Sequence, residues 1–273
     1  MKNKKALIIT IVTAIALLAI TIYSALVVRP HIIKVREETL ISNKINDKLD
    51  GFLVAYFCDL NYGNNLKDED IENIEKKIND FNPDLIIFGG DLISDKCADT
   101  SKLISFLDNL DAKYGKYAVL GNEDVYNQNA RNILEQTNFR LLSNANEKVY
   151  VDGSFVNIVG VDPSVMGLPN VSEAYSGVNS DYYTIAITHC PDYADKLDTS
   201  SSDYILSGHS LGGPVYIPLI NFFYRPSGAQ NYFKGKYNVG SAILDVSTGL
   251  GTKEKDIRLF TDAEIVLYKL KAK

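Results

Sequence analysis

The sequence contains no tryptophan and only three cysteines in 273 residues, and negative charge outweighs positive charge. The lack of tryptophan excludes little about function. Cys58, Cys97 and Cys190 have no CxxC spacing and are odd in number, so they predict neither a disulfide framework nor a zinc ribbon. We expect Cys58 and Cys190 to behave as small buried apolar side chains, with a disulfide between them as the alternative in an oxidising compartment. The net charge of −6 argues against a nucleic-acid-binding protein, which usually has a basic face.

The longest uncharged run is the 23 residues at 6–28. As a helix this run would be about 34 Å long, enough to cross a hydrocarbon core of about 30 Å. The three lysines before it predict a cytoplasmic N-terminus and an extracytoplasmic C-terminal domain. A signal peptide cleaved near Ser24 and Ala25 is the alternative, and a buried core helix is not expected because the run has no polar face. The predicted segments are an anchor at 1–28, a linker with a first strand at 29–50, and one domain at 51–273.

In the first half of the domain, segments with apolar residues at helical spacing alternate with short strand-like apolar runs. Apolar side chains recur at helical spacing over 68–81, 100–110 and 130–136, and strand-like apolar runs lie between these segments. This alternation predicts βαβ units and a mostly parallel sheet. The second half has further strand-like runs with fewer helices between them.

Five apolar runs in the domain end on a residue whose side chain can bind a metal ion. In an α/β domain the carboxyl ends of parallel strands converge on one crevice, where ligands bind. Two aspartates, one asparagine and two of the chain's three histidines would therefore meet at one rim, and these donors suit a divalent cation. The runs are Phe52–Asp59, Asp84–Asp91, Tyr117–Asn122, Thr184–His189 and Tyr204–His209.

The motifs at these strand ends are Asp59-Leu60-Asn61, Gly90-Asp91, Gly121-Asn122-Glu123-Asp124, Thr188-His189 and Gly208-His209-Ser210-Leu211-Gly212-Gly213. Their order and spacing resemble the calcineurin-like metallophosphoesterases, which have Asp-x-His, Gly-Asp, Gly-Asn-His, a lone histidine after a strand, and Gly-His-x-His. The resemblance extends over about residues 50–271. The stretch at 246–270 also resembles the closing strands of the membrane-anchored subgroup.

This resemblance implies an α/β fold with a two-sheet β-sandwich flanked by helices, here preceded by one N-terminal transmembrane helix. It implies hydrolysis of phosphodiester or pyrophosphate bonds, in some members within lipid-linked substrates. The family carries two divalent cations, for which manganese, zinc, iron and cobalt are the candidates here. The matching ligands are Asp91, Asn122, His189 and His209 for one cation, and Asp59, Asn61, Asp91 and Leu211 for the other, with Asp91 shared.

Three positions depart from the family pattern, each where the family has a histidine. Asn61 offers a weak neutral oxygen in place of an imidazole, and Leu211 has no donor atom. We therefore expect one intact and one impaired metal site, with one bound cation or two. Glu123 replaces the histidine that contacts the phosphate and protonates the leaving group, a role commonly worth about 10²–10⁴ in rate. Glu123 and Asp124 could instead be a solvated loop pair.

A competing motif overlaps the last of these segments. The letters GHSLG at 208–212 match Gly-x-Ser-x-Gly, the nucleophile elbow of serine hydrolases. A helix should follow the serine, but the run at 215–224 favours an extended segment that packs on the sheet, or alternatively docks on a membrane. No histidine lies beyond His209 to complete a triad. We therefore interpret Ser210 as a substitution within a metal-binding loop.

The sequence as a whole favours a metal-dependent phosphoesterase, anchored by its N-terminal helix at the outer face of a cell membrane. Its expected ligands are a phosphorylated small molecule or a lipid head group, and no nucleic acid. The alternative is a catalytically inactive family member that binds a metal or a phosphorylated ligand. Metal content and phosphodiesterase activity distinguish the two.

Overall fold

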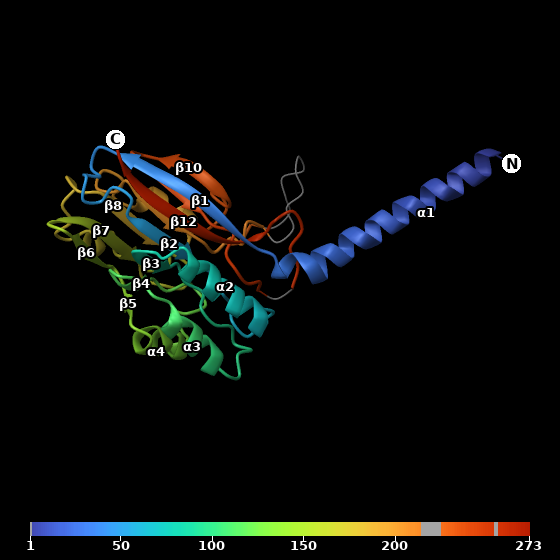
Figure 1. Ribbon diagram of the computed structural model, residues 1–273, viewed down its shortest axis with the longest axis horizontal. Coiled ribbons are helices and arrows are strands. Elements are labelled where there is room, and N and C mark those ends of the chain that lie inside the picture. Colours follow the sequence, from blue (N-terminus) through green and yellow to red (C-terminus); the bar gives the residue numbers. More distant parts are fainter. Residues whose placement is uncertain (1, 214–224, 254–255) are drawn as a thin grey trace.

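The computed structural model of the chain describes residues 2–213, 225–253 and 256–273. These residues form a long N-terminal helix and a domain in which two mixed β-sheets pack face to face between helices (Figure 1). The fold is thus the α/β two-sheet sandwich that the resemblance implies. The apolar run at 215–224 lies outside the described residues.

The first sheet has six strands within the described residues, in the order β1-β12-β2-β3-β4-β5. β2 to β5 are parallel, because α2 (Asp68–Asp80), α3 (Ser101–Asn109) and α4 (Gln128–Gln136) connect them in turn. The three helices and the βαβ units predicted from periodicity are therefore confirmed. The strands are β1 Ile33–Ser42, β2 Leu53–Phe57, β3 Leu85–Phe88, β4 Lys116–Ala118, β5 Phe139–Leu141 and β12 Ala263–Ala272.

The second sheet also has six described strands, in the order β10-β11-β9-β8-β7-β6. β7, β8, β9 and β11 are parallel, and β6 and β10 pair antiparallel at the two edges. A short helix α5 (Val171–Ala174) and a 3-10 helix (Pro191–Lys196) accompany this sheet. The strands are β6 Ala145–Val151, β7 Ser154–Val161, β8 Thr184–Thr188, β9 Tyr204–Ser207, β10 Gly235–Val239 and β11 Ala242–Val246.

Apolar side chains fill three layers: one between the sheets and one on the outer face of each sheet. α2 shows how the outer layer forms. Three acidic residues in its first turn suit the positive end of the helix dipole, and Ile71, Ile74 and Ile78 recur at helical spacing and are buried. Cys58 and Cys190 are buried and free, so the alternative of a bridge between them is not realised.

The N-terminal segment begins with α1 (Lys2–Tyr23), which extends away from the domain (Figure 1). A π-helical turn (Ser24–Val28) and a 3-10 turn (Arg29–His31) lead from it into β1. Among the described residues, Lys4–His31 forms one helical segment that is long and apolar enough to cross a membrane, and its most apolar part is not buried in the protein. This is compatible with a single-pass anchor and with a signal sequence.

The strand predicted within residues 29–50 is β1. All of its ten residues pair in parallel with β12, so β1 is the edge strand of the first sheet. Arg29 forms an ion pair with Asp262 (2.6 Å), and the N–H of Arg258 donates to the carbonyl oxygen of Ala25 (3.0 Å). The base of the N-terminal segment is therefore bonded to the loop that precedes β12.

Candidate metal centre

The carboxyl ends of five strands from both sheets meet at one edge of the sandwich. β2, β3 and β4 lead to Asp59, Asp91 and Asn122, and β8 and β9 lead to His189 and His209. Asp91, His189 and His209 are all buried. One ligand atom from each of these three residues lies within 4.8 Å of the other two, a group able to hold a metal ion.

The backbone at this edge is strained. The left-handed region of φ is uncommon for residues other than glycine, and a bulky side chain there is an outlier. Strained residues persist only where the surrounding structure fixes them, and they cluster at functional sites. The residues with positive φ at this edge are Asp59 (54°), Asn61 (45°), Asp91 (59°), His209 (68°) and Leu211 (52°).

His189 presents one ring nitrogen to the centre. Its Nδ1–H donates to the carbonyl oxygen of Gly89 (2.8 Å), which leaves Nε2 as the nitrogen with a free lone pair in the neutral ring. Nε2 lies 3.3 Å from Asp91 Oδ2 and makes no well-directed hydrogen bond within the described residues. Burial opposes charge on the ring, but the carboxylates, first Asp91 and then Asp59, raise the pKa of His189 to about 10. A proton and a metal ion therefore compete for Nε2.

His209 is oriented in a similar way through its other nitrogen. Its Nε2–H donates to the carbonyl oxygen of Ser227 (2.8 Å), so Nδ1 carries the lone pair. Nδ1 is buried and has no hydrogen-bond partner among the described residues. Burial, followed by the charge on His189, lowers the pKa of His209 to about 4. The ring is therefore neutral at neutral pH, the state in which imidazole binds a metal.

Asn122 supplies a further oxygen whose orientation is fixed. Its Nδ2 donates to Glu123 Oε1 (2.9 Å), and its Oδ1 is buried without a partner in the described part of the chain. Asp91 Oδ1 accepts the N–H of Glu123 (3.0 Å). An unpaired buried polar atom commonly costs about 1–3 kcal/mol, and a cation that binds Asn122 Oδ1 and both free imidazole nitrogens removes that penalty. These residues fit one divalent cation.

Asp124 holds the loops that carry Asp91 and Asn122. It is 1% exposed, and its carboxylate accepts three backbone N–H bonds, from Asp91 (2.7 Å), Leu92 (2.8 Å) and Gly121 (2.9 Å). Burial, and then the charge on Asp91, raise the pKa of Asp124 to about 7. Gly121 must be glycine, because a Cβ there would lie 2.1 Å from Asp91 Oδ1. The alternative of a solvated pair is therefore wrong for Asp124.

The other half of the expected two-metal centre has a different character. Both oxygens of Asp59 accept the backbone N–H of His209 (3.1 and 3.0 Å). Asn61 is 2% exposed, and its Nδ2 has no hydrogen-bond partner among the described residues. The Leu211 side chain is buried and offers no donor atom. A carboxylate bonded to the backbone, an amide N–H and a hydrocarbon do not fit a second cation.

Lys253 enters this half from the loop between β11 and β12. Its Nζ lies 3.1 Å from Asp91 Oδ2 and 3.3 Å from Glu123 Oε1. Burial opposes its charge, but the carboxylates, Asp91 first, raise the pKa of Lys253 above its ordinary value. Lys253 is not among the residues predicted from the sequence. A lysine directly after Gly-Leu-Gly-Thr at the carboxyl end of a parallel strand was the available signal.

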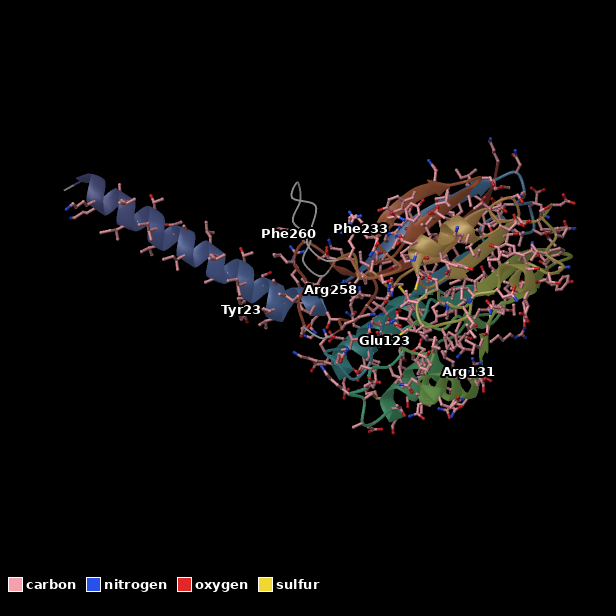
Figure 2. All side chains as sticks on the ribbon, turned by 180° about the vertical axis from the view of Figure 1, so that it is seen from behind. Tyr23, Glu123, Arg131, Phe233, Arg258 and Phe260 are labelled. Atoms are coloured by element: carbon pink, nitrogen blue, oxygen red, sulfur yellow. The ribbon has the colours of Figure 1, made fainter. Side chains whose placement is uncertain are left out.

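Glu123 lies beside the candidate cation site rather than within it. Its side chain is exposed, and Oε1 accepts from Asn122 Nδ2 and lies within ion-pair distance of Lys253. In the view of Figure 2, Glu123 lies between Tyr23 at the end of α1 and Arg131 on α4. The exposed carboxyl group is accessible to a substrate that approaches this edge.

Ser210 does not have the surroundings of a nucleophile. It is 2% exposed, its hydroxyl donates to the carbonyl oxygen of Phe233 (2.5 Å), and its Oγ accepts the N–H of Gly212 (3.0 Å). The nearby His209 ring bonds to Ser227 and not to Ser210. Ser210 therefore stabilises the loop, and the serine-hydrolase interpretation has no support from its contacts.

Two open cavities adjoin the centre on the side of α4. The first has a volume of about 500 Å³ and is lined by Asn122, Glu123, Tyr126 and Met166 among others. The second, of about 490 Å³, shares Tyr126 and Met166 and adds Leu168. Tyr126, Met166 and Leu168 are 76%, 53% and 85% exposed. The cavity that reaches Asn122 is lined mostly by polar residues, and the exposed apolar side chains lie where it adjoins the second cavity.

A family model identifies the family of the chain. The model for calcineurin-like phosphoesterases matches residues 64–213, more than half of the chain. The chain belongs to this family. Calcineurin-like phosphoesterases use divalent metal ions, which agrees with the Asp91, His189 and His209 group. The matched segment includes these residues but neither Asn61 nor Lys253, the residues that distinguish the second half of the centre.

Curated members of the family resemble nearly the whole chain. An uncharacterized metallophosphoesterase YkuE of Bacillus subtilis is 29% identical over 89% of this chain and 87% of its own length. An uncharacterized metallophosphoesterase Cj0846 of Campylobacter jejuni is 27% identical over 98% of this chain and 72% of its own. A protein named UDP-2,3-diacylglucosamine pyrophosphatase LpxG, of Chlamydia muridarum, is 25% identical over 80% of this chain and 83% of its own.

Proposed function

We propose that the chain is a metal-dependent phosphoesterase that hydrolyses phosphodiester or pyrophosphate bonds with one divalent cation. The observation that carries the proposal is a set of three buried ligand atoms without hydrogen-bond partners in the described chain: His209 Nδ1, Asn122 Oδ1 and His189 Nε2, which becomes an acceptor once it loses its proton. A divalent cation bound there with Asp91 supplies Lewis acidity toward a phosphoryl oxygen and activation of water. Manganese, zinc, iron and cobalt all accept such imidazole and oxygen ligands.

The chain's own residues give this site its orientation. Carbonyl oxygens at Gly89 and Ser227 fix the two imidazole rings, a kind of support that commonly changes metal affinity about 10–100-fold when lost. Asp59 holds the backbone of His209 in place. Glu123 is the candidate catalytic residue, because it stands next to Asn122 in place of the family histidine, and its exposed carboxylate also lies within ion-pair distance of Lys253.

The test uses the full-length protein in detergent, stripped of metal and reloaded separately with Mn²⁺, Zn²⁺, Fe²⁺ and Co²⁺. We expect hydrolysis of bis(p-nitrophenyl) phosphate with at least one metal. Asp91→Ala should reduce turnover at least about 10³-fold, since Asp91 is shared by the whole centre. Asp108→Ala, an exposed position on α3, is the matched control.

The alternative function is a non-catalytic protein that binds a metal or a phosphorylated ligand. The three histidine losses, at Asn61, Glu123 and Leu211, favour it, because each removes a group that the family uses. A chain that binds its cation tightly but hydrolyses no phosphodiester, phosphomonoester or pyrophosphate with any of the four metals would establish the alternative. A chain that binds no cation would contradict the phosphoesterase function and would leave binding of a phosphorylated ligand as the alternative.

We further propose that the substrate is lipid-linked, with its phosphate at the centre and its apolar part along the adjoining cavities. The name of the Chlamydia relative supports this substrate class, and the exposed Tyr126, Met166 and Leu168 supply a matching apolar rim. Leu168→Ser should reduce kcat/KM for a long-chain lipid pyrophosphate, and leave kcat/KM for bis(p-nitrophenyl) phosphate unchanged. Ile41→Ser, at an equally apolar exposed position on β1, is the control. Equal losses on both substrates would contradict the lipid-binding role.

The N-terminal segment is proposed to be an uncleaved membrane anchor at 1–28, followed by a linker and first strand at 29–50 and the phosphoesterase domain from 51 to 273. The exposed apolar helix supports the anchor, and the lysines before it support an extracytoplasmic domain. Protease treatment of intact cells should digest the domain while the N-terminus stays protected. A mature protein that begins near Ala25 would show that the segment is a signal peptide instead.

A further inference from the structure

Lys253 lies on the side of Asp91 where a second cation would be expected. Asp91 Oδ2 is 3.3 Å from His189 Nε2 and 3.1 Å from Lys253 Nζ. Glu123 Oε1, at 3.3 Å, is a second carboxylate contact of the same ammonium group. The shared carboxylate oxygen therefore contacts both a residue of the candidate cation site and a positively charged side chain.

The loop that carries Lys253 is bonded on several sides, so the position of the lysine is built into the fold. Its backbone N–H groups at 250 and 251 donate to the carbonyl oxygens of Cys58 (3.0 Å) and Asp59 (2.7 Å). Asn64 Nδ2 donates to the carbonyl oxygen of Thr252 (2.9 Å). The buried guanidinium of Arg258 donates to three carbonyl oxygens of the loop, at residues 248, 249 and 251 (2.6–3.1 Å).

Lys253 and Asn61 bring N–H donors to this part of the centre, and the carboxyl groups of Asp95 and Glu123 line the same cavity. Asn61 Nδ2 is a buried N–H donor with no partner in the described chain, and Leu211 removes the imidazole that would bind a cation. An open cavity of about 250 Å³ is lined by Asn61, Asn64 and Lys253 among others. Two N–H donors, one of them charged, therefore border a space next to the cation site.

We propose that the Lys253 ammonium takes the place of the second cation, so that the chain binds a single divalent ion and holds a phosphoryl group between that ion and Lys253. This inference rests on the proposed function, because it assumes the first cation. An ammonium has three N–H donors; two of them face Asp91 and Glu123, which leaves one for a phosphoryl oxygen, and the group provides no Lewis acid for water. The two halves of the centre thus divide the work: the ion activates, and Lys253 binds the anion.

Metal counting separates this arrangement from a two-metal centre. Full-length protein in detergent is saturated with Mn²⁺, freed of excess metal, and analysed by mass spectrometry and electron paramagnetic resonance. We expect about one ion per chain and the spectrum of an isolated Mn²⁺ ion. Two ions with a spin-coupled spectrum would overturn the inference while leaving the phosphoesterase proposal intact. No bound ion would instead contradict the proposed function itself.

Restoring the two histidines that the family has at positions 61 and 211 tests whether Lys253 excludes a second ion. The double variant Asn61→His/Leu211→His should still bind about one ion, because Lys253 occupies the space. Adding Lys253→Ala should raise the count to about two and produce spin coupling. A double variant that binds two ions with Lys253 present would overturn the inference. Circular dichroism checks that both variants fold.

The single variant Lys253→Met tests the same inference without introducing new metal ligands. Removing the charge beside Asp91 should make Mn²⁺ bind about tenfold more tightly, while KM for the phosphodiester rises about tenfold or more. These opposite shifts are not expected from a residue that only supports the fold. Lys96→Met, an exposed lysine at the same cavity, is the matched control and should leave the Mn²⁺ affinity unchanged. Unchanged Mn²⁺ affinity in Lys253→Met, or a loss of it, would overturn the inference.

Discussion

The two halves of the centre share Asp91 but differ in what faces the shared carboxylate. On one side are His189, His209 and Asn122, whose free nitrogen and oxygen lone pairs are buried and unpartnered in the described chain. On the other side are the Lys253 ammonium and an unpaired amide N–H of Asn61. The first half presents two imidazole nitrogens and an amide oxygen, which suit a cation, whereas in the second half an ammonium and an amide N–H accompany the Asp59 carboxylate.

In the proposed arrangement, the centre has lost the ligands of one metal ion, and a positively charged side chain lies in their place. The substitutions at Asn61 and Leu211 remove imidazole donors, and Lys253 supplies positive charge from a third segment of the chain. A count of surviving ligands alone would suggest a damaged site. The contacts around Asp91 support the proposed arrangement, in which Lys253 supplies positive charge and a single metal ion is bound.

The largest expected difference is between alanine substitutions of one residue from each half, His189 and Asn61. His189→Ala should weaken Mn²⁺ binding at least about 100-fold, because it removes a ligand whose ring is already oriented. Asn61→Ala should change Mn²⁺ affinity less than about twofold, since Asn61 Nδ2 has no hydrogen bond to lose among the described residues. Isothermal titration calorimetry measures both. Similar losses in the two variants would show that both halves bind metal.

The pH dependence of metal binding tests the protonation states of the two histidines in the first half. Without a bound ion, His189 with a pKa of about 10 holds a proton at neutral pH, and His209 with a pKa of about 4 does not. Binding therefore releases about one proton per ion, and affinity should rise about tenfold for each pH unit between about pH 5 and pH 9. Titration in buffers with different ionisation enthalpies measures the released proton. A pH-independent affinity would contradict the raised pKa of His189.

Sequence reasoning found the first half of the centre because its signals are local. Each of the five strand runs ends on a polar residue, and the topology of parallel strands brings such ends together. His189 and His209, 20 positions apart in the sequence, follow neighbouring parallel strands, so their meeting follows from the fold. The helices over 68–81, 100–110 and 130–136 were predictable for the same reason, since amphipathic spacing is visible within one segment.

Lys253 and Asp124 escaped prediction because their roles depend on distant contacts. Nothing near Lys253 in the sequence reveals that its loop pairs with Cys58 and Asp59, nearly 200 positions earlier. Asp124 stands beside the exposed Glu123 in a polar stretch, yet the turn after Gly121 directs it inward to three backbone N–H groups. Which side chain of a polar loop faces inward is decided by tertiary packing and not by local pattern.

Asp124 supports both halves, so its replacement tests whether they share one scaffold. Asp124→Asn keeps the size of the side chain but replaces one acceptor oxygen with an N–H₂ group, which cannot accept the N–H of Asp91 or Leu92. We expect a loss of about 2–3 kcal/mol in unfolding free energy, equivalent to a Tm lower by about 6–8 °C. Differential scanning calorimetry with Asp108→Asn as the exposed control measures this. An unchanged Tm would mean that these bonds do not hold the loops.

The smallest effect is expected for Ser210, which lies between His209 of the first half and Leu211 of the second. Ser210→Ala removes one hydrogen bond to Phe233 and one from Gly212, so Tm should fall by about 4 °C. Phosphodiester turnover should stay within about threefold, because the hydroxyl is committed to the loop and does not reach the centre as a free nucleophile. Loss of turnover with metal content unchanged would instead revive the serine-nucleophile hypothesis. The comparison of the two halves would then have to include a covalent step at the residue that joins them.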